Sequence, residues 1–114
     1  MEEIMKIAIP TVDGVLCMHF GHCEKFALVD VDGKEVKDVQ FLTPPLHAPG
    51  VLPKWLHEQG ANVIIASGMG SRAQMLFKEN EIDVLIGAPI MEPEKIVKQY
   101  IAGELALGGN VCDH

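Results

Sequence analysis

Val63-Ile-Ile-Ala-Ser-Gly-Met-Gly-Ser-Arg-Ala73 runs from four apolar residues through a glycine-rich turn into a segment with helical spacing. A short strand that is apolar throughout is typical of a sheet covered on both faces. A second such run, Val84 to Ile86, follows the helical segment. Two buried strands joined by a helix form a βαβ unit. This half of the chain therefore predicts an α/β fold with parallel strands.

The preceding half has the pattern of an antiparallel sheet. Asp32-Gly33 separates two β-type runs, which is a hairpin signal. Pro10 is expected to end the first strand, because proline cannot donate to a ladder. The expected elements are strands 4–9, 26–31 and 36–42, a helix from 51 stopped at Gly60, strand 63–66, a helix opening at 68–71, strand 84–86, and a helix from Pro93 broken by Gly108-Gly109.

The order of these elements is βββαβαβα. Right-handed crossovers place the later strands parallel to the first and on its other side. We therefore expect a five-stranded mixed sheet flanked by helices. Residues 1–107 are expected to form a single cofactor-binding domain, with residues 108–114 as a C-terminal tail.

Composition narrows the classes of function. The chain has 114 residues and a formal charge of −7, which argues against nucleic-acid binding and against a polybasic membrane patch. Its apolar runs are far shorter than the ~20 residues of a membrane span, and its N-terminus lacks the features of a secretion signal. We expect a cytoplasmic protein whose three cysteines stay as thiols.

The segment Cys17-Met-His19-Phe-Gly-His22-Cys23 is the strongest candidate site. Thiolate and imidazole are the ligands that soft metals and metal–sulfur clusters prefer, so Cys17, His19, His22 and Cys23 are candidate ligands. The alternative is that the two cysteines are small buried apolar residues. Cys112 and His114 could complete the site, but a solvent-exposed terminus is the better expectation, and His47 is expected on a surface loop.

A second candidate site is the turn formed by Gly68, Gly70, Ser71 and Arg72. A strand that enters a helix through glycines presents backbone N–H groups that bind anions. Arg72 could add a charge-assisted contact. Tight packing of the helix on its strand explains the glycines equally well. A dinucleotide site is disfavoured, because the next strand ends without an acidic residue for a ribose.

The segment His19-Phe-Gly-His22-Cys23-Glu-Lys-Phe26 before a hairpin, followed by Gly68-Met-Gly70-Ser-Arg72-Ala73 opening a helix, resembles the dinitrogenase iron–molybdenum cofactor biosynthesis family. The resemblance covers roughly Met5 to Leu107. It implies a ribonuclease-H-like fold without nuclease activity. It also implies binding of an iron–molybdenum or related metal–sulfur cluster, with His19 at the position of the family's cofactor-linked histidine.

The function expected from these observations is that of a carrier, not an enzyme. The protein would hold a metal–sulfur cluster of iron, with molybdenum as an option, and exchange it with donor and acceptor proteins. It would do so as an accessory-type protein of the kind that serves nitrogenase. Two alternatives stay open: a structural or regulatory zinc-binding module, and a small domain that senses an anion or nucleotide at the Gly68 turn.

Overall fold

The computed structural model describes residues 4–18, 23–45 and 50–108. In this part of the chain, a mixed sheet has the strand order β4-β3-β1-β5-β6, and β2 pairs with β1. The strands are β1 Ile4–Val12, β2 Val15–Leu16, β3 Lys25–Asp32, β4 Glu35–Leu42, β5 Val63–Ile65 and β6 Asp83–Leu85, and the helices are α1 Val51–Glu58, α2 Ser71–Glu79 and α3 Pro93–Ala102.

The predicted α/β class and mixed sheet are confirmed. β1 is antiparallel to β3 and parallel to β5, and β5 is parallel to β6. The predicted hairpin is β3–β4, in which Asp32 pairs with Glu35 around a two-residue loop. Gly33 opens that loop with a positive φ of 62°, a conformation that glycine adopts without strain. The chain therefore begins as an antiparallel unit and continues as parallel βαβ units.

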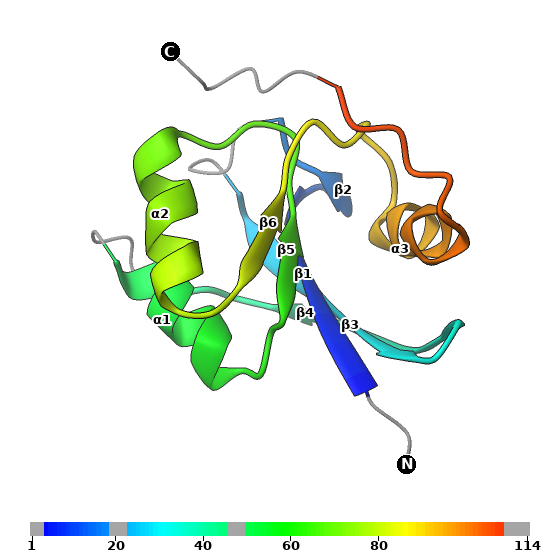
Figure 1. Ribbon diagram of the computed structural model, residues 1–114, viewed down its shortest axis with the longest axis horizontal. Coiled ribbons are helices and arrows are strands. Elements are labelled where there is room, and N and C mark those ends of the chain that lie inside the picture. Colours follow the sequence, from blue (N-terminus) through cyan, green and yellow to red (C-terminus); the bar gives the residue numbers. More distant parts are fainter. Residues whose placement is uncertain (1–3, 19–22, 46–49, 109–114) are drawn as a thin grey trace.

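Helices cover both faces of the sheet (Figure 1). α1 and α2 lie on one face and α3 lies on the other. The side chains of β1 alternate between the two faces of the sheet and so contribute to both cores. Ala8 packs into the cluster under α1 and α2, while Ile7 and Ile9 pack into the cluster under α3. All three side chains are fully buried. Covering both faces explains why the central strands are apolar at nearly every position.

The expectation that Pro10 ends the first strand is wrong. β1 continues to Val12, and Pro10 pairs with Phe26 in the ladder with β3. The Pro10 carbonyl accepts a hydrogen bond from the Cys17 N–H at 3.0 Å, on the side away from β3. The proline nitrogen faces the same side, where the pairing of β1 with β5 has already ended at Ala8. The missing N–H therefore removes no hydrogen bond from the pairing of β1 with β3 or β5; it removes only a possible donor opposite Cys17, one residue beyond the end of β2.

The expectation that Gly108-Gly109 breaks the last helix is also wrong. α3 ends at Ala102, and Gly103 adopts a left-handed conformation with φ 75°. This is the usual glycine cap one residue after a helix. The following segment then reaches Gly87, where the Gly108 N–H donates to the Gly87 carbonyl at 2.6 Å. Gly108 thus contacts the turn after β6 instead of ending a helix.

The contact between Gly87 and Gly108 predicts the effect of a methyl group. Gly87 has φ +84°, and a Cβ there would overlap the backbone of Gly108. Gly14 has nearly the same φ, +83°, with open space around it. We expect Gly14→Ala to lower the free energy of unfolding by about 1 kcal/mol, and Gly87→Ala by about 1 kcal/mol more. Urea unfolding of both variants checks this, and equal losses would contradict the role of the backbone contact.

Candidate metal–sulfur site

The two cysteines flank the carboxyl end of β1. The Cys17 N–H donates to the Pro10 carbonyl at 3.0 Å, and the Glu24 N–H donates to the Thr11 carbonyl at 2.7 Å. Successive residues of a strand direct their carbonyls to opposite sides. The chain is therefore tied to one side of β1 at Cys17 and to the other side immediately after Cys23. These two hydrogen bonds, here named the β1 anchors, fix the backbone next to each thiol.

Thr11 also shapes this site, although it was not among the residues predicted from the sequence. Its side chain is buried, and its Oγ1 donates to the Lys25 carbonyl at 2.9 Å. This bond ties the first residue of β3 to β1, two residues beyond Cys23. A threonine among apolar strand residues is the only signal in the sequence, because a buried hydroxyl needs a partner. Thr11 thus supports the second β1 anchor with a side-chain hydrogen bond.

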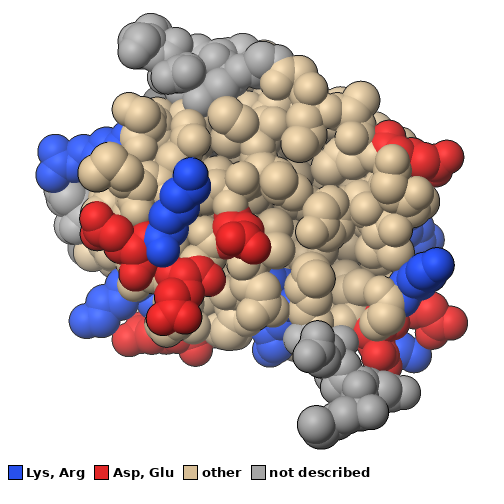
Figure 2. Space-filling view, in the orientation of Figure 1, with Lys and Arg blue, Asp and Glu red and all other residues tan. Residues whose placement is uncertain are grey.

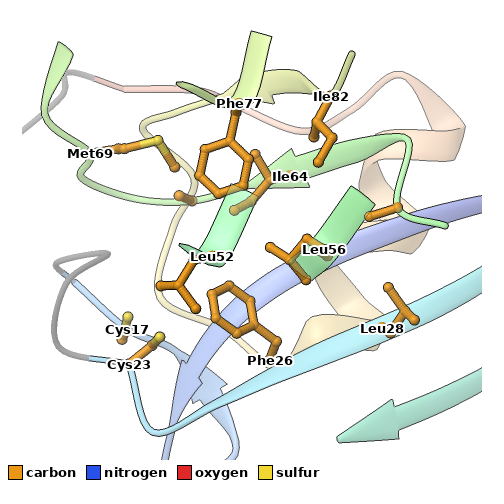
Figure 3. Packing of buried hydrophobic residues seen from close by; sticks show 13 residues of the cluster. Cys17, Cys23, Phe26, Leu28, Leu52, Leu56, Ile64, Met69, Phe77 and Ile82 are labelled. Carbon is orange, nitrogen blue, oxygen red and sulfur yellow. The ribbon is translucent and has the colours of Figure 1, made fainter. Parts of the chain in front are cut away.

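The thiols themselves lie side by side in the core (Figure 3). Cys17 is 6% exposed and Cys23 is 9% exposed, and both belong to the cluster under α1 and α2. Burial, together with the charge of Cys17, raises the pKa of Cys23 from 9.0 to about 12. Cys23 is therefore a protonated thiol at neutral pH. It must release its proton to become a metal ligand.

The glycine-rich turn lies at the same edge of the sheet. β5 runs parallel to β1, so their carboxyl ends meet at one edge. Gly68 is buried, and Met69 packs into the cluster that contains both thiols. Gly70 precedes α2 without a side-chain cap, and the side chains of Ser71 and Arg72 are exposed. Met69 thus anchors the residues before α2 in the same buried layer as the thiols.

The other predicted ligands lie outside the described residues. They are His19, His22, His47, Cys112 and His114. Within residues 4–18, 23–45 and 50–108, no three His, Cys, Asp or Glu side chains gather as a metal site. The same part of the chain contains no helix long and apolar enough to cross a membrane. What the structure brings together is therefore the thiol pair and the Gly68–Met69 turn.

Uncharged segments surround this edge of the sheet. Figure 2 shows a broad face without Lys, Arg, Asp or Glu below the grey segment at its top. Three apolar side chains are well exposed in these segments: Met18, Ile90 and Leu107. The segments without a charged residue are 15–18, 66–71, 86–91 and 105–108. A partner that docks here would meet an apolar surface with little charge to desolvate.

The fold and the paired thiols define an α/β protein with ribonuclease-H-like topology and a thiol site at the carboxyl edge of its sheet. A family model described as dinitrogenase iron-molybdenum cofactor matches residues 3–103. This chain belongs to that family. The resemblance stated from the sequence is thereby confirmed.

Relatives extend over nearly the whole chain. The uncharacterized protein MJ0580 of Methanocaldococcus jannaschii is 32% identical over 108 residues, which cover 90% of this chain and 91% of the relative. The crystal structure of PH0822 has a TM-score of 0.84 at 31% identity, covering 90% of this chain and 94% of that one. The crystal structure of MJ0327, also from M. jannaschii, has a TM-score of 0.72 at 23% identity, covering 93% and 96%. That last likeness bears on the fold alone.

Proposed function

We propose that this protein binds a metal–sulfur cluster of the iron–molybdenum type, holds it, and passes it to an acceptor protein. The observation that carries the proposal is the pair of thiols, Cys17 and Cys23, held together at the carboxyl edge of the sheet. Thiolate is the ligand that iron–sulfur clusters and other soft metal sites prefer. Membership of a family described by the dinitrogenase cofactor supports this class of cargo.

The proposed ligands are Cys17, His19, His22 and Cys23. His19 and His22 stand between the two cysteines in the sequence, and the β1 anchors bring the ends of that segment to the same strand. Loading the site releases the proton of the Cys23 thiol, so binding is expected to strengthen as the pH rises. The protein's own contribution is to supply the ligands and to exclude water around them.

The start of α2 is proposed to face the anionic cargo. The first N–H groups of a helix have no partner within the helix, and this helix has no side-chain cap. A helix N-terminus favours negative charge by about 0.3–1 kcal/mol. Arg72 is exposed and adds a positive charge at the same end. The Gly68–Arg72 turn would thus stabilise a cluster without ligating it.

The test is metal and acid-labile sulfide analysis of anaerobically reconstituted protein, with its visible spectrum. We expect iron, or iron with molybdenum, together with sulfide. Cys17→Ser/Cys23→Ser and His19→Ala should each reduce the bound metal by about tenfold or more. His57→Ala is the matched control, because His57 is exposed on α1 and should leave binding unchanged. Cys112→Ser tests in parallel whether the C-terminal cysteine contributes.

Three outcomes would contradict the proposal. Zinc bound without sulfide would indicate the structural zinc module, since two thiolates and two imidazoles also suit zinc. Binding of an anion or nucleotide that survives the cysteine substitutions and is lost in Gly70→Val would indicate the sensor. Absence of any metal after reconstitution would mean that the thiols serve only to pack the core.

A further inference from the structure

We propose that Cys17 and Cys23 form a reversible disulfide with each other, which makes the pair an oxidative modification site. The consequence for metal binding rests on the proposed function above, whereas the disulfide itself does not. The oxidant required is a small-molecule disulfide, such as oxidised glutathione.

The placement of the two side chains carries this inference. Both lie in one buried cluster, and Figure 3 shows their sulfur atoms next to each other. A disulfide requires the two Cβ atoms to lie about 4 Å apart, so most cysteine pairs cannot form one without backbone movement. Here the β1 anchors attach Cys17 to Pro10 and Glu24, the neighbour of Cys23, to Thr11. Adjacent residues of one strand therefore hold both backbones in place.

Strand alternation explains why the Cys17 thiol reaches the layer under α1 and α2. Leu16 is the last residue of β2 and packs under α3, so the next residue, Cys17, points to the other face. Cys23 precedes β3 and is not part of its alternation, and its thiol lies in the same cluster as Phe26. The pair is thus a product of how the chain is held around β1 and not of a short cysteine motif.

The reaction exchanges disulfides and balances without any other reagent. One thiolate attacks the small disulfide, a mixed disulfide forms, and the first small thiol leaves. The second protein thiolate then attacks the protein sulfur of the mixed disulfide and releases the second small thiol. Two electrons pass to the small disulfide, and the two protons of Cys17 and Cys23 end on the two released thiols. A reducing dithiol reverses both steps.

Oxidation would switch off the proposed cluster site. Thiolates ligate metals, and a disulfide offers none. The bond also closes the chain between Cys17 and Cys23, which constrains the unfolded state and raises Tm. The two chemical forms should therefore differ in metal uptake and in thermal stability.

The first experiment uses the full chain with Cys112→Ser, so that only the pair remains. The protein is treated with oxidised glutathione under anaerobic conditions, then unfolded for thiol titration and intact-mass analysis. We expect no titratable thiol, a mass lower by two hydrogen atoms, and a Tm raised by several degrees, all reversed by dithiothreitol. Variants that also carry Cys17→Ser or Cys23→Ser should show no such mass loss. Two unreacted thiols, or two bound glutathiones, would overturn the proposal.

The second experiment separates this inference from the proposed function. Reduced and oxidised forms of the same variant are reconstituted with iron and sulfide, and the oxidised form is expected to bind at least about tenfold less. If the disulfide forms but the reduced protein takes up no cluster, the proposed function is wrong and the modification site stands. If no disulfide forms but the reduced protein takes up the cluster, the modification site is wrong and the carrier stands.

Discussion

Phe26→Ala is expected to lower the free energy of unfolding by about 4 kcal/mol, the middle of the range for a buried phenylalanine. Phe26 is fully buried in the cluster under α1 and α2. Its ring meets that of Trp55 edge to face, with centroids 5.8 Å apart and an interplanar angle of 62°. The substitution removes this contact and leaves a cavity between β3 and α1. Because Cys17 and Cys23 belong to the same cluster, the loss also loosens the candidate site.

The matched control for this prediction is Phe41→Ala. Phe41 lies on β4, the neighbouring strand, but its side chain is 47% exposed. We expect its substitution to cost less than about 1 kcal/mol, since little apolar surface is buried there. Chemical denaturation with both variants checks the difference. Equal losses would show that the Phe26–Trp55 contact does not organise this layer.

Stability is expected to fall at alkaline pH because of Cys23. The unfolded thiol ionises near 9.0, whereas the pKa of the folded thiol is raised to about 12. The folded state therefore keeps this proton up to a higher pH than the unfolded state does. The contribution of the protonated thiol to the free energy of unfolding is present in full below pH 9 and is lost between pH 9 and pH 12. The slope is about 1.4 kcal/mol per pH unit for one proton. Between about pH 8 and pH 10.5 the free energy of unfolding is expected to fall by about 2 kcal/mol because of this group.

The measurement is the free energy of unfolding at both pH values for the parent protein and for Cys23→Ala. All other ionisable groups are common to both proteins, so the difference between their pH dependences isolates the thiol. The parent should lose about 2 kcal/mol more than the variant. If both proteins lose the same amount, the Cys23 thiol is not buried as the structure has it. Reducing agent in all samples keeps disulfide chemistry out of the comparison.

Much of the fold could be predicted because local pattern and global fold agree. The run Val63 to Ile65 is apolar at every position, as a strand covered on both faces should be. Asp32-Gly33 specifies the hairpin between β3 and β4. The errors arose where a local rule depends on tertiary surroundings. Pro10 continues β1 because its nitrogen faces away from β3, at a point that the pairing with β5 does not reach, which no local pattern reveals. Gly108 contacts Gly87 through a long-range backbone contact that sequence spacing does not encode.

The candidate site was only partly accessible from the sequence. The residue types of Cys17 and Cys23 indicate a soft metal, but their proximity depends on the register of β2 and β3 around β1. The sharing of one sheet edge by the thiols and the Gly68 turn follows from the right-handed crossover and was predictable. The burial of Met69 in the cluster that also contains the thiols was not, because its direction is set by the turn geometry. The sequence shows which residue types could bind a metal, whereas the fold decides which of these residues lie close together.

The β1 anchors have a consequence for how such proteins diversify. Both anchors use main-chain atoms, Cys17 to Pro10 and Glu24 to Thr11, so neither depends on the identity of residues 18–22. The peptide between them can therefore be exchanged for another of equal length while the sheet and helices keep their sequence. New ligand preferences could evolve, or be selected from a library, by rewriting that peptide alone. The residues that set the fold and the residues that set the ligand preference can therefore change independently.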